Sequence, residues 1–321
     1  MESLGKSILV TGGCGFIGSD FLRQMVKKYP ETLFVNLDAL TYAGDPKKVE
    51  AIAECENYVF VHGNICDRDL VNSLFEKYNF DKVVHFAAES HVDNSIKNSQ
   101  IFLETNVMGT QVLLEACRIY GVDRFHYVST DEVYGDLPID RPDLLFSEDT
   151  ALNPSSPYSV SKASGDMLTQ AYGRTHKVPY SISRCSNNYG EFQDQEKLIP
   201  TVVRKIRAGE KIPVYGDGKN VRDWIYVSEH NTGVEAILLK GENGGIYNLG
   251  SNNEWSNIDL VKLIIKLMGA SEDCIEFVED RKGHDERYAI DFHNTYEKIG
   301  WKSRYDRSNF EEKLKEVIEF Y

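Results

Sequence analysis

The sequence predicts an α/β protein built on a doubly wound parallel sheet, and three observations support this fold class. Short apolar, strand-like segments alternate with helix-like segments through the first half of the chain. A glycine-rich turn follows the first of these strands, and polar residues follow later ones, at the sheet edge where such folds bind ligands. The 321 residues suffice for one large domain or two closely joined domains.

The glycine-rich turn after the first predicted strand, residues 7–10, indicates a nucleotide cofactor. Its spacing is Gly12-x-x-Gly15-x-x-Gly18, and a helix-like stretch follows to residue 28. Glycine permits a tight turn and lets the backbone approach a pyrophosphate, which the helix N-terminus favours electrostatically. The sequence therefore predicts dinucleotide binding at this turn.

The second predicted strand, residues 33–37, ends at Asp38. This acid follows Gly18 by about twenty residues, the distance at which an acid meets the ribose hydroxyls in dinucleotide-binding folds. Because a carboxylate would repel a 2′-phosphate, Asp38 favours NAD over NADP.

Two further strands are predicted over residues 58–61 and 82–86. Asp67 is placed to cap the helix that follows the first of them. The second leads into Ala87 and Ala88, whose small side chains would let the chain pass close to a flat cofactor. Both segments continue the β-α-β alternation.

Long helical patterns cover about residues 98–120 and 157–176, and a strand is predicted over 178–183. After about residue 184, Asn and Gly become frequent and the elements become shorter. Residues 224–239 again have the pattern of a strand followed by a helix. The second lobe is therefore expected to be interleaved with the first.

The expected division is into two domains of unequal size. Residues 1–186 with 223–246 are predicted to form a Rossmann-type NAD-binding domain. Residues 187–222 with 247–321 are predicted to form a smaller substrate-binding lobe.

Polar residues at the end of an apolar strand that begins at residue 124 form the main catalytic signal. They are Thr130, Asp131 and Glu132, and the pair Tyr158-x-x-x-Lys162 follows on a predicted helix. A Tyr and a Lys spaced i, i+4 lie on one helix face. There the ammonium can lower the phenol pKa and make Tyr158 a base for an alcohol proton. A simple alcohol dehydrogenase needs no more, so the two carboxyl groups predict a second reaction, such as removal of a carbon-bound proton with loss of a hydroxyl.

Composition excludes several classes of protein. The net charge of -14 argues against nucleic-acid binding. No apolar run approaches the roughly 18 residues of a membrane span, and the N-terminus lacks a signal-peptide pattern, so a cytoplasmic protein is expected. The six cysteines are scattered without a CxxC pair, and no His/Cys cluster has ligand spacing. Reduced thiols and no metal site are therefore predicted.

These motifs resemble the extended short-chain dehydrogenase/reductases and, more narrowly, the dTDP-glucose 4,6-dehydratase family of the rhamnose pathway. The resemblance covers essentially the whole chain. Its marks, beside the motifs above, are residues 40–44, 87–93, 129–135, 184–190, 196–200, 221–224 and 283–291. The Thr-Asp-Glu triplet together with Asn-Asn-Tyr-Gly (187–190) and Glu-Lys-Leu-Ile-Pro (196–200) is specific to sugar-nucleotide 4,6-dehydratases.

The resemblance implies an NAD-dependent hydro-lyase that converts dTDP-glucose to dTDP-4-keto-6-deoxyglucose. Tyr158 would take the C4 hydroxyl proton while NAD+ accepts the hydride, and Lys162 would hold the nicotinamide ribose. Glu132 would then remove the C5 proton, and a protonated Asp131 would donate to the leaving C6 hydroxyl before the hydride returns to C6. Thr130 would hydrogen-bond the C4 oxygen. Splitting two adjacent carboxyl groups into an acid and a base makes physical sense, because they cannot cheaply share one charge state.

The resemblance also implies binding residues and an assembly. The cofactor would meet the glycine turn and Phe16, Ile17, Asp38, Thr41, Asn64, Ile65, Ala87, Ala88 and Thr105. Ser90 would touch the glucose, and Asn188 and Arg222 the diphosphate. The nucleotide pocket would be lined by Lys197, Leu198, Pro200, Tyr215, Asn257, Arg281 and His284. The helices over about 98–120 and 157–176 would form a four-helix homodimer interface.

Some residues depart from the family pattern. Residues 191–195, Glu-Phe-Gln-Asp-Gln, replace a Pro-Tyr-x-x-Pro-like stretch beside the nucleotide pocket, which leaves thymine or uracil open. Asn64 stands where the family has Asp, although its amide oxygen can accept from the adenine amine. The same reaction on a UDP-sugar stays an alternative. A UDP-sugar 4-epimerase is another, but it has no use for the Asp131–Glu132 pair. An idle NAD- or sugar-nucleotide-binding protein is the third.

Overall fold

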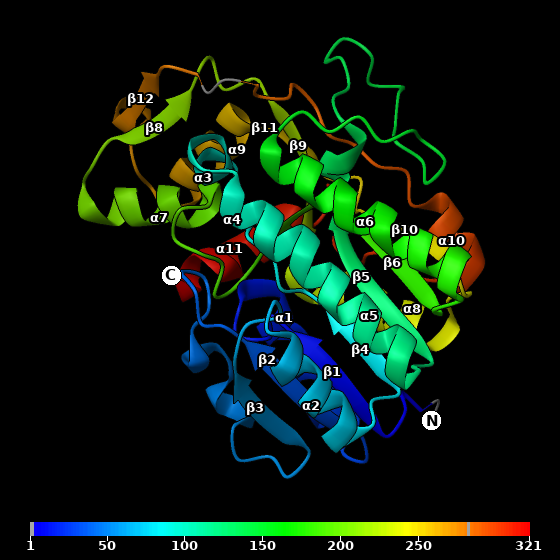
Figure 1. The fold of residues 1–321 in the computed structure, drawn as a ribbon. Helices are drawn as coiled ribbons and strands as arrows, with labels where there is room; N and C mark the ends of the chain where they lie inside the picture. The colour runs from blue at the N-terminus through cyan, green and yellow to red at the C-terminus, as the bar shows by residue number, and fades with distance from the viewer. Residues whose placement is uncertain (1–2, 281–282) are drawn as a thin grey trace.

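A seven-stranded parallel sheet forms the centre of the molecule (Figure 1). The computed structural model describes residues 3–280 and 283–321. The strands of this sheet are β1 (Ser7–Thr11), β2 (Leu33–Asp38), β3 (Tyr58–His62), β4 (Lys82–His85), β5 (Arg124–Thr130), β6 (Tyr180–Cys185) and β10 (Gly245–Leu249). Their order is β10-β6-β5-β4-β1-β2-β3, and every neighbouring pair is parallel. This confirms the predicted fold class.

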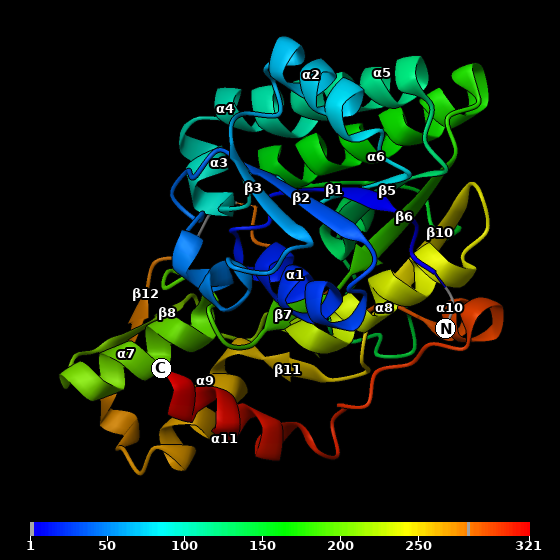
Figure 2. The ribbon, with the colours of Figure 1, turned by 90° about the horizontal axis from the view of Figure 1, so that it is seen from below.

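Helices cover both faces of the sheet, which Figure 2 shows as three layers. One face carries α2 (Arg68–Tyr78), α5 (Thr110–Tyr120) and α6 (Pro157–His176), and the other carries α1 (Phe16–Lys28) and α8 (Val227–Lys240). Each face has its own apolar core. Phe75 of α2 and Leu113 of α5 belong to one buried cluster, while Phe21 of α1 and Ile237 of α8 belong to the other. The large sheet is therefore covered on both sides, as a parallel sheet must be.

The predicted helix over residues 98–120 contains a π-helical turn. Its parts are α4 (Gln100–Leu103), the π-helical η2 (Glu104–Gly109) and α5, after a short helix α3 (Val92–Lys97). Asn106 in this turn is buried, and its amide exchanges hydrogen bonds of 2.8 and 2.9 Å with the backbone of Glu89. The same amide donates to Ser161 Oγ of α6 at 2.8 Å. The turn thus fixes the segment after β4 against two helices.

Most of the remaining elements form the smaller lobe, on one side of the sheet (Figures 1 and 2). Its strands are β7 (Asn187–Tyr189), β9 (Val221–Tyr226) and β11 (Glu254–Ser256) in one sheet, and β8 (Ile212–Tyr215) and β12 (Ile275–Val278) in another. Its helices are α7 (Leu198–Ala208), α9 (Asn257–Leu267) and α11 (Phe310–Phe320). Shorter elements are η1 (Pro46–Ile52), η3 (Asp131–Tyr134), η4 (Glu272–Cys274) and α10 (His293–Ile299).

A separate buried core joins the helices of this lobe, with Val202 of α7, Ile264 of α9 and Leu314 of α11. The division of the chain into two domains stays a prediction. Strand β9, most of which was expected in the NAD-binding domain, pairs in the small sheet. Strand β10 pairs in the large sheet as far as Leu249, slightly beyond the expected boundary at residue 246.

The strand order reverses at β1, with β2 and β3 on one side and β4, β5, β6 and β10 on the other. In doubly wound sheets the ligand crevice opens at this reversal, outside the carboxyl ends of the strands. The segments that follow β1, β2, β4 and β5, which begin at Gly12, Ala39, Phe86 and Asp131, all leave the sheet at this edge. Within the described ranges, no helix has the length and apolar character needed to cross a bilayer.

Candidate active site

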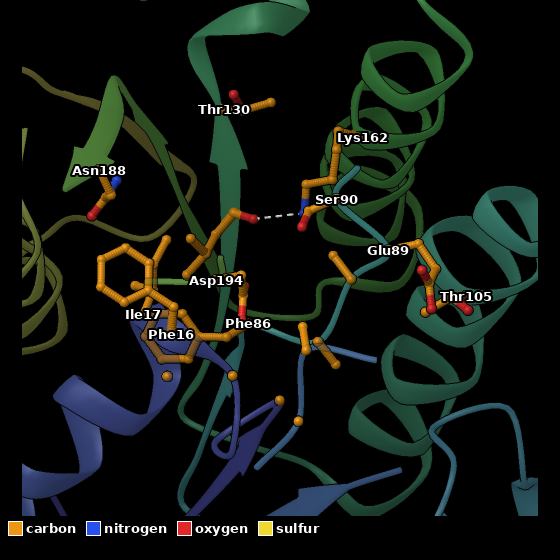
Figure 3. Close-up of a pocket in the computed structure, with 18 of the residues that line it drawn as sticks. Phe16, Ile17, Phe86, Glu89, Ser90, Thr105, Thr130, Lys162, Asn188 and Asp194 are labelled. Carbon is orange, nitrogen blue, oxygen red and sulfur yellow. Dashed lines mark hydrogen bonds between the residues drawn. The ribbon is translucent and has the colours of Figure 1, made fainter. Parts of the chain in front are cut away.

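A pocket at the carboxyl edge of the sheet brings together the predicted catalytic and cofactor-binding residues (Figure 3). Its catalytic lining is Thr130, Asp131, Glu132, Tyr158 and Lys162. The remaining predicted cofactor residues in its wall are Gly12, Gly15, Phe16, Ile17, Gly18, Asp38, Thr41, Asn64, Ile65, Ala87, Ala88 and Thr105. They reach it from η2, from the start of α1 and from the loops after β1, β2, β3 and β4.

The glycine turn is packed so closely that side chains would not fit. Gly12 has φ +71°, and a Cβ there would lie 2.6 Å from the backbone N and Cα of Ala87. A Cβ on Gly18 would lie 2.4 Å from the carbonyl oxygen of Gly12. Helix α1 begins at Phe16. Its N-cap residue is Gly15, which has no side chain to hydrogen-bond the free N–H groups of the first turn. The turn therefore offers backbone N–H groups and a helix N-terminus to a pyrophosphate, as NAD requires.

Asp38, at the end of β2, is buried and held in one orientation. Its Oδ2 accepts a hydrogen bond from the backbone N–H of Cys14 at 2.8 Å, and its Oδ1 accepts one from Leu40 at 2.8 Å. A fixed carboxylate beside the glycine turn can accept from ribose hydroxyls and would repel a 2′-phosphate. These residues fit NAD.

The two carboxyl groups lie in the short turn η3, directly after β5. Thr130 caps this turn, because its Oγ1 accepts a hydrogen bond from the backbone N–H of Glu132 at 3.3 Å. The same hydroxyl donates to Asp131 Oδ1 at 3.3 Å. Asp131 is 1% exposed, whereas Glu132 is half-buried. Adjacent residues therefore occupy different environments.

Burial raises the pKa of Asp131 well above its ordinary value, and the nearby carboxylates of Glu132 and Asp223 raise it further. The positive charge of Arg222 and the hydrogen bond from Thr130 oppose this shift in the pKa. Asp131 Oδ2 is buried and has no hydrogen-bond partner among the described residues. A carboxyl group kept neutral, with one oxygen unengaged, is suited to donate a proton.

Helix α6 presents Tyr158 and Lys162 from its first turns. The helix is started by a capping box in which Ser156 and Ser159 bond each other's backbone N–H. Lys162 Nζ donates to the carbonyl oxygen of Val128 at 2.8 Å (Figure 3). The capping box thus fixes the register that places both side chains in the pocket.

Burial controls the pKa values of this pair. It lowers the pKa of Lys162 from 10.5 to about 8. It raises the pKa of Tyr158 well above 10, and the carboxylate of Glu132 adds to that rise. The predicted lowering of the Tyr158 pKa by Lys162 is therefore wrong for this geometry, since burial outweighs the effect and the ammonium is bonded to a backbone carbonyl.

Three predicted substrate residues, beside Thr130, line the same pocket: Ser90, Asn188 and Lys197. Lys197 Nζ donates to the carbonyl oxygen of Ser90 at 3.3 Å. Asn188 Oδ1 lies 3.0 Å from Nδ1 of His230, so the ring donates and the amide is oriented. The substrate side therefore has a cation and an oriented amide within the lining.

The other predicted substrate residues lie outside the pocket lining. Leu198 and Pro200 belong to α7, Asn257 begins α9, and Tyr215 ends β8 with an exposed ring. Their elements belong to the smaller lobe, so their distance from the pocket depends on how that lobe packs.

Arg222 and His284 are engaged elsewhere in the smaller lobe. Arg222 is buried, donates to the carbonyl oxygen of Asp285 at 2.9 Å and lies 4.1 Å from the ring centre of Tyr288. Its charge acts on the pKa of Asp131, so it lies near the catalytic turn. His284 Nδ1 lies 2.7 Å from an oxygen of Asp280. Arg281 lies outside the described residues.

Several lining residues were not identified from the sequence. They include Gly44, Phe86, Glu89, Ser129, Cys185, Ser186, Gln193 and Asp194. Most lie inside motifs already quoted, so their neighbours could have indicated them. Gln193 and Asp194 lie in the stretch that departs from the family pattern, where no motif was available. Nowhere in residues 3–280 and 283–321 do three or more His, Cys, Asp or Glu side chains gather as a metal site.

Comparisons with known proteins agree with this geometry. A family model described as GDP-mannose 4,6 dehydratase matches residues 9–317. The low-salt glycan biosynthesis protein Agl12 of Haloferax volcanii is 46% identical over 314 residues, covering 98% of each chain. A dTDP-glucose 4,6-dehydratase of Salmonella typhimurium is 44% identical, covering 98% of this chain and 92% of its own.

A solved structure is also similar to this chain over nearly its whole length. The crystal structure of DesIV, a dTDP-glucose 4,6-dehydratase from Streptomyces venezuelae with NAD and TYD bound, matches with a TM-score of 0.93 and 40% identity. The match covers 98% of this chain and 96% of that one.

Proposed function

Because the chain belongs to the family of sugar-nucleotide 4,6-dehydratases that includes the dTDP-glucose enzymes, we propose that it is an NAD-dependent dTDP-glucose 4,6-dehydratase. The product is dTDP-4-keto-6-deoxyglucose. One observation carries this proposal: a buried Asp131 with a raised pKa stands beside Glu132, in the same pocket as Tyr158 and Lys162. Oxidation alone would use the Tyr–Lys pair and leave a costly buried acid without a role.

The residues divide the proton transfers between them. Tyr158 accepts the proton of the C4 hydroxyl, and the Thr130 hydroxyl orients the C4 oxygen. Lys162, with a pKa of about 8, is largely charged at neutral pH. Its positive charge on the same helix face opposes the effect of burial, which holds the pKa of Tyr158 well above 10. NAD+, when bound, supplies the acceptor of the C4 hydride and then its donor to C6.

The elimination belongs to the carboxyl pair. The C4 ketone acidifies the neighbouring C5–H, whose proton Glu132 removes as a base. Asp131 donates its proton to the departing C6 hydroxyl, which leaves as water. As C6 is reduced, Glu132 returns a proton to C5. Tyr158 then loses the proton it gained and Asp131 regains the one it gave, by exchange with solvent. Carbon C4 is oxidised and C6 is reduced, so the turnover is redox-neutral and its net change is loss of one water.

Binding roles follow from position and from the family. Ser90, Asn188 and Lys197 line the pocket and would contact the sugar and diphosphate. Arg222, near the catalytic turn, would meet the diphosphate. The nucleotide would be held by Leu198, Pro200, Tyr215, Asn257, Arg281 and His284.

An assembly and a location complete the proposal. Large apolar side chains are exposed on the helical layer formed by α4, η2, α5 and α6: Ile101, Leu103, Met108, Ile119, Val160 and Met167. Such a face favours a homodimer in which these helices pack against their symmetry copies. The six cysteines are free thiols, which favours a cytoplasmic location.

The test is incubation of the purified protein with dTDP-glucose and, separately, with UDP-glucose, without added NAD. Loss of water is followed by mass spectrometry, and the 4-keto sugar by its alkaline absorbance. Loss of water from dTDP-glucose alone supports both the reaction and the base. Loss from UDP-glucose retains the mechanism and changes the base. A galactose product of unchanged mass would mean a 4-epimerase and refute the role of the carboxyl pair.

A further inference from the structure

An ion pair between Lys48 and Asp194 connects two sides of the pocket. Lys48 lies in η1, shortly after the pocket-lining residues Ala43 and Gly44. Its Nζ donates to the carbonyl oxygen of Ala43 at 2.9 Å and lies 3.0 Å from Asp194 Oδ1. Asp194 lines the pocket from the loop between β7 and α7. One ammonium therefore joins the rim on the cofactor side to a loop on the substrate side.

Both partners are largely removed from water. The side chains of Lys48 and Asp194 are 10% and 17% exposed. An ion pair in such surroundings is held by a charge-assisted hydrogen bond, and breaking it leaves two charges in a poorly solvated place. The pair is therefore expected to resist separation far more than an ion pair on the surface would.

A second contact supports the same connection. Phe192, two residues before Asp194, has φ +65°, which is uncommon for a residue with a side chain. The guanidinium of Arg23 in α1 lies 4.7 Å from the centre of its ring. The same guanidinium donates to the carbonyl oxygen of Lys48 at 2.6 Å. Arg23 thus contacts both sides of the ion pair.

The loop itself is anchored to the smaller lobe. Tyr321 donates to the carbonyl oxygens of Gly190 at 2.8 Å and Gln193 at 3.2 Å. Tyr226 of β9 donates to the Glu191 carboxylate at 2.8 Å. Because these contacts hold the loop on the substrate side, opening the pocket between this loop and residues 43–48 requires the Lys48–Asp194 pair to part.

We propose that the Lys48–Asp194 pair is a latch that holds the substrate-side loop against the cofactor-side rim and slows the release of bound NAD. The latch rests on the proposed function, which identifies the bound cofactor. A dehydratase restores its cofactor in each turnover and gains nothing by releasing it. Slow release is therefore compatible with rapid catalysis.

The experiment measures NAD release directly. Native protein and the variants K48M, D194N and K48M/D194N are loaded with radiolabelled NAD, and exchange into excess unlabelled NAD is followed. Lys47 is an exposed neighbour, so K47M removes the same charge without touching the pair and serves as the matched control. D194N keeps the shape of the side chain, and thermal unfolding of each variant establishes that it is folded.

Each single variant should release NAD roughly tenfold to hundredfold faster than the native protein, the effect of losing one charge-assisted hydrogen bond. The double variant should be no faster than the faster single variant, because the second change finds the latch already broken. K47M should match the native protein in NAD release. Turnover at saturating NAD should stay close to native in K48M and K47M, whose residues lie outside the pocket lining.

Other outcomes separate the two proposals. Release at the native rate from folded K48M and D194N would overturn the latch alone. Fully additive effects in the double variant would also overturn it, because the two residues would then act independently. Native protein that binds no NAD would overturn both proposals. Failure to turn over dTDP-glucose, with the expected release rates, would leave the latch standing and overturn only the assigned substrate.

Discussion

Replacing Asp131 with asparagine should stop the loss of water while leaving the earlier chemistry intact. The Asp131 side chain is buried, its pKa is raised by burial, and its Oδ2 has no hydrogen-bond partner among the described residues. Asparagine has nearly the same shape and is also neutral, but it has no proton to give. The variant therefore removes the proposed acid without removing a charge or opening a cavity.

The expected losses of rate and of stability follow from comparing the asparagine with the native aspartic acid. A positioned general acid contributes about 10²–10⁴ in rate, so kcat for water loss should fall by that factor in D131N. Both side chains are neutral and leave one buried polar atom unpaired, so the free energy of unfolding should change by no more than about 1 kcal/mol. A large loss of rate with little loss of stability would distinguish an acid from a structural residue.

The assay runs both carboxyl variants in D2O with dTDP-glucose. Deuterium at C5 of the recovered substrate reports oxidation, proton exchange and reversal, while mass spectrometry reports loss of water. D131N should retain C5 exchange and lose dehydration, whereas E132Q should lose both. Dehydration within tenfold of native in D131N would refute the assignment of Asp131. Native C5 exchange in E132Q would refute that of Glu132.

Three further predictions concern pH, the glycine turn and a buried ion pair. Turnover should fall as pH rises through about 8, because the lowered pKa of Lys162 makes its ammonium lose a proton there. Asp131 must also stay protonated to act as the acid. A pH–rate profile that stays flat to pH 10 would contradict this. G12A should lack copurified NAD, measured by chromatography of heat-released nucleotide, because the new Cβ would lie 2.6 Å from backbone atoms; a native NAD content would refute it. R184M should lose about 3–5 kcal/mol of unfolding free energy in urea titrations, because it strands the buried Asp166 carboxylate that Arg184 holds at 2.9 Å. A loss below 1 kcal/mol would mean that this pair contributes little.

The fold and most of the pocket could be predicted because their determinants are local. Gly12, Asp38 and Thr130 each lie at or directly after the carboxyl end of a strand. Parallel strands place all their carboxyl ends on one edge, so three separate local patterns converge in space without further information. The i, i+4 spacing of Tyr158 and Lys162 works in the same way, since a helix fixes which residues share a face.

Other features depend on contacts that no local pattern encodes. The direction of the Tyr158 pKa shift depends on burial, which overrides the spacing to Lys162. The Lys48–Asp194 pair joins residues 146 positions apart, one of them in a stretch that departs from the family pattern. The placement of Arg222 likewise depends on how β9 packs against the residues around Tyr288.

The division of labour between the two carboxyl groups also depends on tertiary structure. Asp131 and Glu132 are neighbours in sequence, and in an extended chain they would titrate almost alike. In the short turn η3 the two side chains lie in different environments, because Asp131 is buried while Glu132 is only half-buried. The charge of the Glu132 carboxylate then raises the pKa of Asp131 further, which favours a protonated acid beside the base. Acid and base are thus separated by the turn after β5, and a change that unwinds this turn should abolish dehydration even if both carboxyl groups remain.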